Sequence, residues 1–108
     1  MSDSFLDLHA GLDLEIGRLV LAEMYEEDDS ADLVIVVEGD QYSITLKSAL
    51  QPIIFPDDDL LYAVGKLVDL HIERGSHLRS ATYHYEKEAA GTWVMSAKFE
   101  YDRPEGVD

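Results

Sequence analysis

The sequence predicts an α+β fold, in which two helices cover one face of a four-stranded antiparallel sheet. Two long segments repeat apolar residues at helical spacing, and four shorter segments alternate apolar with polar residues. Along the chain these segments follow the order αββαββ. Both helices and both strand pairs have one apolar side, so a single shared core buries all of them. The 108 residues are expected to form one domain, 1–108.

The first segment is predicted to be a helix from about Phe5 to about Tyr25, with Ser4 as its N-cap. Four adjacent carboxylates, residues 26–29, follow it. These repel one another and oppose the negative end of the helix dipole. We therefore expect the helix to end there and all four carboxylates to lie in solvent. Its apolar stripe consists of Phe5, Leu8, Leu12, Ile16 and Leu19.

Residues 33–37 and 42–46 are predicted to form a hairpin around Gly39-Asp40. Closing this turn pairs Val37 with Tyr42, and the same register continues along both strands. The expected core face holds the pairs Val37–Tyr42, Ile35–Ile44 and Leu33–Leu46. The other face is polar except for Val34 and Val36. Two valines on a polar face indicate partial cover, and we expect a homodimer to supply it.

Residues 48–56 connect this hairpin to the second helix. The stretch 51–55 is apolar for a loop and is expected to pack against the core. Asp57 suits the N-cap of the second helix, because its side chain can accept a hydrogen bond from a backbone amide of the first turn. Gly75 suits the C-terminal stop, since glycine adopts the left-handed conformation without strain.

Residues 76–102 are predicted to form the second hairpin, with a loop at residues 87–91. Five aromatic residues share one side of this hairpin, which we expect to lie against the helices: Tyr83, Tyr85, Trp93, Phe99 and Tyr101. A buried tryptophan implies that Trp93→Ala costs roughly 3–5 kcal/mol. Residues 103–108 are expected to be a frayed tail.

Acidic residues outnumber basic ones by 23 to 8, which gives a net charge of −15. Residues 1–40 carry twelve acids and one base, Arg18. A nucleic-acid binder needs a basic face, so this class is disfavoured, as is binding to anionic membranes. The chain has no apolar run of membrane-spanning length, no cysteine and no basic N-terminal signal. These features are typical of a cytoplasmic protein.

Catalytic and metal-binding signatures are missing from the sequence. The four histidines, His9, His71, His77 and His84, lack the short spacing of metal ligands. His84 and Glu86 share a strand face and could hold a metal loosely, but a solvated polar face accounts for them better. Nucleophile-elbow and phosphate-loop patterns do not occur. We expect no enzyme activity, no cofactor and no metal.

The remaining class is a protein that acts through its surface. An acidic surface speeds encounter with a basic partner. The predicted binding surfaces are the end of the first helix with its loop, and the polar face of the last hairpin. The candidate partner-binding residues are Glu23, Glu26, Glu27, Asp28, Asp29, Asp32, Glu100 and Asp102.

The last hairpin reads Ala81-Thr82-Tyr83-His84-Tyr85, then Gly91-Thr92-Trp93, and closes with Phe99-Glu100-Tyr101-Asp102. Together with the αββαββ order and the small acidic chain, this ending resembles the YezG-like immunity proteins of bacterial toxin systems. The resemblance implies a non-catalytic protein that binds a cognate toxin in the cytoplasm of the producing cell and blocks its active site or substrate surface. The second helix is shorter and the first hairpin more compact than in that family. An oligomeric or small-ligand-binding module of similar fold is the alternative.

Overall fold

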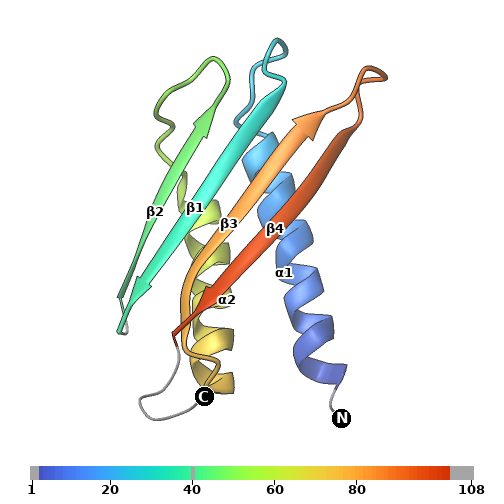
Figure 1. Cartoon of the computed structure of the whole chain (residues 1–108). Coiled ribbons are helices and arrows are strands. Elements are labelled where there is room, and N and C mark those ends of the chain that lie inside the picture. Colours follow the sequence, from blue (N-terminus) through green and yellow to red (C-terminus); the bar gives the residue numbers. More distant parts are fainter. Residues whose placement is uncertain (1–2, 40, 103–108) are drawn as a thin grey trace.

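The computed structural model describes residues 3–39 and 41–102 (Figure 1). The predicted tail and Asp40 of the predicted turn lie outside these residues. The elements are α1 (Asp3–Leu21), β1 (Ser30–Glu38), β2 (Gln41–Ser48), α2 (Asp58–Arg74), β3 (Leu78–Lys87) and β4 (Trp93–Tyr101). The strands form one antiparallel sheet in the order β2-β1-β3-β4, and both helices lie on one face of it. The predicted α+β fold is therefore confirmed.

The core lies between the helices and the two central strands, β1 and β3. Leu33, Ile35 and Val37 of β1 are buried, as predicted from their alternation. The predicted register of β1 and β2 is also confirmed, with Val37 opposite Tyr42 and Leu33 opposite Leu46. Helix α1 contributes Ile16 and Val20 to this core, while α2 contributes Leu60, Ala63, Val64, Leu67 and Val68.

Helix α1 differs from its prediction at both ends. The backbone is helical from Asp3, so Ser4 is not the N-cap. The helix ends at Leu21 rather than near Tyr25. The backbone amide of Tyr25 donates to the Asp28 side chain at 2.8 Å, which stabilises a turn in place of another helical turn.

Strand β4 is less buried than its pattern predicted. Tyr83 and Tyr85 of β3 are buried, but Trp93 and Phe99 of β4 are only half-buried. Met95 and Tyr101 are 43% and 49% exposed. The helices pack over the central strands, so they cover β4 and the other edge strand, β2, only in part. The prediction of burial is therefore confirmed for Tyr83, but it is wrong for Trp93 and Phe99, which are only partly buried.

The connection between β2 and α2 also departs from its prediction. Ile54 is buried, and its amide donates to the carbonyl of Leu46 at 2.9 Å. Ile53 and Phe55, on either side of it, are 70% and 86% exposed, since side chains alternate in this extended segment. The predicted caps of α2 are confirmed: Asp57 accepts from the amide of Leu60 at 2.9 Å, and Gly75 is left-handed with φ 73°. In the described part of the chain, neither helix is long and apolar enough to cross a membrane.

Candidate functional site

Three loops lie together at one end of the sheet (Figure 1). They join α1 to β1 (residues 22–29), β2 to α2 (49–57) and β3 to β4 (88–92). We call these three segments the loop end. Backbone hydrogen bonds connect its neighbours: the amide of Lys87 donates to Asp29 at 2.9 Å, and the amide of Ala49 donates to Ser30 at 3.0 Å. The end of the acidic segment, residues 26–29, is therefore hydrogen-bonded to β3, and the next residue, Ser30, is hydrogen-bonded to the residue that follows β2.

The Asp28 carboxylate holds two of these loops together. It accepts hydrogen bonds from the amides of Tyr25 (2.8 Å) and Leu50 (2.9 Å), from Ser48 Oγ (2.8 Å) and from Gln51 Nε2 (3.0 Å). The side chain is completely buried. Burial raises the pKa of Asp28, but the four hydrogen bonds together lower it by more. The net result is a pKa of about 2, below the ordinary value of 3.8. The expectation that all four carboxylates lie in solvent is thus wrong for Asp28, because four donors from two loops and the end of β2 satisfy it.

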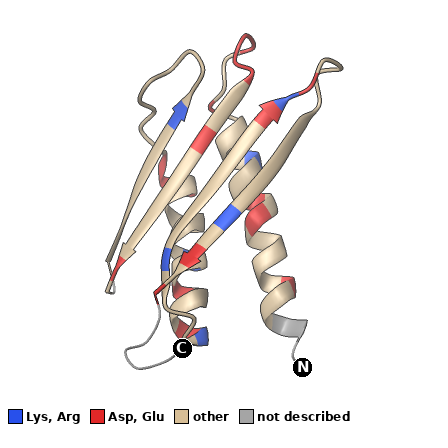
Figure 2. Ribbon diagram, viewed as in Figure 1, with Lys and Arg blue, Asp and Glu red and all other residues tan. Residues whose placement is uncertain are grey.

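The loop end combines exposed apolar side chains with exposed carboxylates. Besides Ile53 and Phe55, the loop end exposes two further apolar or aromatic side chains, Leu50 and Tyr25, which are 55% and 57% exposed. The exposed acids on the three loops and the start of α2 are Glu26, Glu27, Asp29, Asp57, Asp58, Asp59 and Glu88. Figure 2 shows the acidic residues in the loop between α1 and β1. Apolar side chains rimmed by charge are typical of protein-binding surfaces.

The remaining predicted residues are distributed over the molecule. Glu23 lies in the loop end, half-buried, with its carbonyl accepting from Gln51 Nε2 at 3.1 Å. Asp32 lies on the sheet face away from the helices and contacts His84 Nδ1 at 2.7 Å. Glu100 and Asp102 lie at the opposite end of β4, where Arg79 pairs with them at 3.4 and 3.9 Å. The structure therefore brings Glu23, Glu26, Glu27, Asp28 and Asp29 together, but it separates Glu100 and Asp102 from them.

These partners shift the titration of two charged groups on the sheet. Hydrogen bonding to Asp32, and then to Glu86, raises the pKa of His84. Hydrogen bonding from Ser80, and then from Arg79, lowers the pKa of Glu100. Lys98 Nζ also lies 3.5 Å from the Glu100 carboxylate. The acidic groups Asp32, Glu86 and Glu100 of the sheet face thus have charged partners, whereas within residues 3–39 and 41–102 no ion pair involves Glu26, Glu27 or Asp29 of the loop end.

A chain of polar side chains inside the fold was missed by sequence reasoning. His9 Nε2 lies 2.9 Å from His71 Nε2, and His9 Nδ1 lies 3.1 Å from Asp13 Oδ2. The Tyr83 hydroxyl donates to Asp13 Oδ1 at 2.5 Å, and His71 Nδ1 lies 2.8 Å from Ser76 Oγ. The i, i+4 spacing of His9 and Asp13 was one available signal. The meeting of His9 with His71 is tertiary, since 62 positions separate them.

With both histidines neutral, every member of this chain is hydrogen-bonded. Ser76 then donates to His71, His71 to His9, and His9 to the Asp13 carboxylate. Burial, and then the repulsion that His71 and His9 would exert on each other if both were protonated, lowers the pKa of His71 to about 4. Burial, and then the hydrogen bond to Asp13, raises the pKa of Tyr83. The arrangement joins α1, α2 and β3 without an unsatisfied polar group among its five members.

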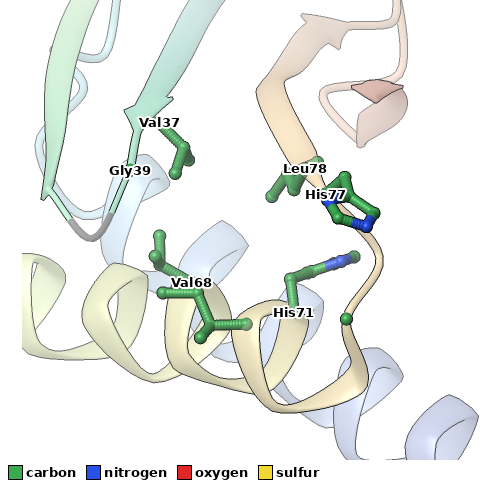
Figure 3. Close-up of a pocket in the computed structure, with 8 residues that line it drawn as sticks. Val37, Gly39, Val68, His71, His77 and Leu78 are labelled. Atoms are coloured by element: carbon green, nitrogen blue, oxygen red, sulfur yellow. The ribbon is translucent and has the colours of Figure 1, made fainter. Parts of the chain in front are cut away.

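A cavity of about 210 Å³ lies beside His71 (Figure 3). Val37, Val68 and Leu78 line it, together with His71 and His77. Ordinary small-molecule pockets measure roughly 300–1,000 Å³, so this cavity is small. Both ring nitrogens of His71 already have protein partners. Within the described residues, no group of three His, Asp or Glu side chains is placed to hold a metal ion.

Stability is expected to fall as the pH drops from about 6.5 to about 4, because unfolded His71 takes up a proton that folded His71 resists. His71→Gln should flatten this fall, since glutamine does not titrate. Exposed His77→Gln is the matched control and should retain the wild-type fall. The measurement is the free energy of unfolding by denaturant at pH 7 and near pH 5. The groups facing His71 are His9 and Asp13 from α1 and Arg74 from α2, and all three are unchanged in both variants. An identical fall in His71→Gln and wild type would contradict the assignment.

Comparison with protein-family models and with curated proteins finds no match for this chain. Its function is therefore argued from its own residues. Among the described features, the polar chain is occupied by its own members, the cavity beside it is small, and two larger hollows beside α1, of about 520 and 370 Å³, are wide open to solvent. The loop end instead exposes both apolar anchors and unpaired charge, which makes it the best candidate for contact with another molecule.

Proposed function

We propose that this chain is a non-catalytic, immunity-type protein that binds and neutralises a basic toxin protein in the cytoplasm. The observation that carries the proposal is the loop end, where 86%-exposed Phe55 and 70%-exposed Ile53 lie among surface carboxylates. Single exposed apolar side chains are common, but a group of them on adjacent loops with charged residues around it is typical of a surface that contacts another protein. The acidic rim selects a partner of positive charge.

The two kinds of side chain have different roles in the proposed complex. The carboxylates of Glu26, Glu27 and Asp29 attract the basic partner at a distance and increase the association rate. Ile53 and Phe55 enter apolar pockets of the partner and slow dissociation. Buried Asp28 is a positioning residue: it joins the loop that carries the charges to the connection that carries the apolar anchors.

The resemblance of the last hairpin and of the element order to YezG-like immunity proteins supports the same proposal. Proteins of that kind bind to a toxin and block it, so they require a complementary binding surface and no catalytic site. The net charge of −15 suits toxins that act on nucleic acids, because such toxins have basic substrate-binding faces. A bound acidic protein would occupy that face in place of the substrate.

The proposal is tested with the product of the neighbouring gene, which is expected to be basic, first by co-expression and pull-down and then by stopped-flow association. Glu26→Gln/Glu27→Gln/Asp29→Asn should lower the association rate about ten-fold at low salt and flatten its salt dependence. The Debye length falls from about 30 Å at 0.01 M salt to about 10 Å at 0.1 M, so the wild-type rate should fall steeply over this range. Asp28 is left unchanged because it is buried.

A matched control removes three charges elsewhere. Asp7→Asn/Asp69→Asn/Glu73→Gln neutralises exposed acids near the start of α1 and the end of α2, far from the loop end. This variant should keep most of the wild-type association rate. A separate variant, Ile53→Ser/Phe55→Ser, should raise the dissociation rate roughly ten-fold or more while leaving the salt dependence unchanged. If both charge variants slow association equally, only net charge matters and the loop end is not the binding site.

A further inference from the structure

The two edge strands of the sheet, β2 and β4, differ in how far their outer backbone is protected from pairing with another strand. Beside β2, Ile54 forms a bridge with Leu46, and the flanking Pro52 and Pro56 have no amide hydrogen to offer another strand. Beside β4, within residues 3–39 and 41–102, only β3 pairs with the strand. The outer edge of β4 therefore presents nine residues of extended backbone. Edges of this length are usually protected in monomers, because they pair readily with another strand.

The helix-facing side of β4 is apolar and partly uncovered. Met95 and Tyr101 are 43% and 49% exposed, and Leu6 and Leu14 of α1 are 64% and 76% exposed. Leu14 and Met95 line one hollow of about 190 Å³ between α1 and β4. Leu6 and Tyr101 line a second, of about 370 Å³, together with Phe99. The two hollows share Asp13 in their lining, are otherwise mainly apolar, and together form a groove between α1 and the unpaired edge strand.

We infer that β4 pairs with β4 of a second copy of this chain, about a two-fold axis at Ala97, to form a continuous eight-stranded sheet. An antiparallel pair of identical strands closes on itself, so the assembly stops at a dimer. On the helix side this register places Trp93 opposite Tyr101 of the second copy, and Met95 opposite its Phe99. Such cross-strand aromatic pairs stabilise a sheet, and the exposed groove residues of both copies become covered.

The charges along β4 favour a second copy over other occupants. The strand carries one base, Lys98, and one acid, Glu100, so its net charge is zero although the whole chain carries −15. In the two-fold register, Lys98 lies opposite Ser96 of the second copy and Glu100 lies opposite its Val94. No two like charges face each other directly, and each Lys98 has a Glu100 close by on its own strand. A basic partner, in contrast, would find more charge at the loop end.

This dimer leaves the proposed binding surface open and goes beyond the proposed function. The paired β4 strands run in opposite directions, so the loop ends of the two copies point to opposite ends of the joined sheet (Figure 1). The dimer would therefore bind two partner molecules independently. The sheet face that carries Val34 and Val36 stays uncovered in this arrangement, which differs from the dimer expected from the sequence.

The test measures the mass of the purified chain by light scattering over a range of concentrations. Wild type should show twice the monomer mass of 12.1 kDa. Ala97→Glu and Ala97→Lys each place two like charges at the axis and should give monomers, while an equal mixture of the two variants should restore the double mass. Ala97 is exposed in the monomer, so both variants should keep the wild-type circular dichroism spectrum.

The matched control is Val34→Lys/Val36→Lys on the sheet face away from the helices, which should remain a dimer. A monomeric wild type at all concentrations would overturn the inference. So would Ala97 variants that remain dimeric when unmixed, because the contact would then lie elsewhere. A monomeric Val34→Lys/Val36→Lys variant beside dimeric Ala97 variants would assign the contact to the open sheet face instead.

Discussion

Replacing Asp28 with alanine is expected to lower the free energy of unfolding by roughly 3 kcal/mol, because four donors lose a buried charged acceptor at once. The measurement is denaturant unfolding at neutral pH. Exposed Asp29→Ala is the matched control, since it removes the same charge from the adjacent position. Its effect should stay within about 0.5 kcal/mol.

The same residue predicts a dependence on pH at the acid end. The pKa of Asp28 is about 2 in the folded protein against 3.8 ordinarily, so its stabilising contribution is complete above pH 3.8 and is lost as the pH falls toward 2. Asp28→Asn keeps the shape of the side chain but cannot titrate, and it should lose less stability over this range than wild type. Equal stabilities of Asp28→Ala and Asp29→Ala would show that the carboxylate does not hold the loops.

The second large effect is expected at Tyr83. Tyr83→Ala should cost roughly 3–5 kcal/mol, because it empties a fully buried site and removes the hydrogen bond to Asp13. Trp93→Ala, from which the sequence pattern predicts a similar loss, should instead cost about 1–2 kcal/mol, because Trp93 is half-buried on an edge strand. The comparison is between unfolding free energies measured under identical conditions.

A third variant separates the two parts of the Tyr83 effect. Tyr83→Phe keeps the ring and removes only the hydroxyl, so it should cost about 1–2 kcal/mol. If Trp93→Ala proves as damaging as Tyr83→Ala, β4 is covered more completely than its exposed surface indicates. Loss of stability at Trp93 that appears only at high protein concentration would instead point to the dimer contact across β4.

Local features of the sequence were sufficient for the secondary structure and the sheet register. Alternation of apolar residues placed Leu33, Ile35 and Val37 on one face, and the two-residue turn then set every pair between β1 and β2. Asp57 and Gly75 correctly bounded the N-terminal and C-terminal sides of α2. These predictions succeeded because they depend on periods and caps that span only a few residues.

Tertiary structure alone decided which residues are buried and which side chains distant in the sequence are in contact. Asp28 and Asp29 belong to the same acidic run, yet four donors, most of them about twenty positions away, surround Asp28, while Asp29 stays exposed. His9 and His71 come within hydrogen-bond distance only when α1 packs on α2. Trp93 alternates as a core residue does, but its strand lies at the edge of the helix layer. An amino-acid pattern states which face of an element is apolar, whereas the amount of cover on that face depends on where other elements lie.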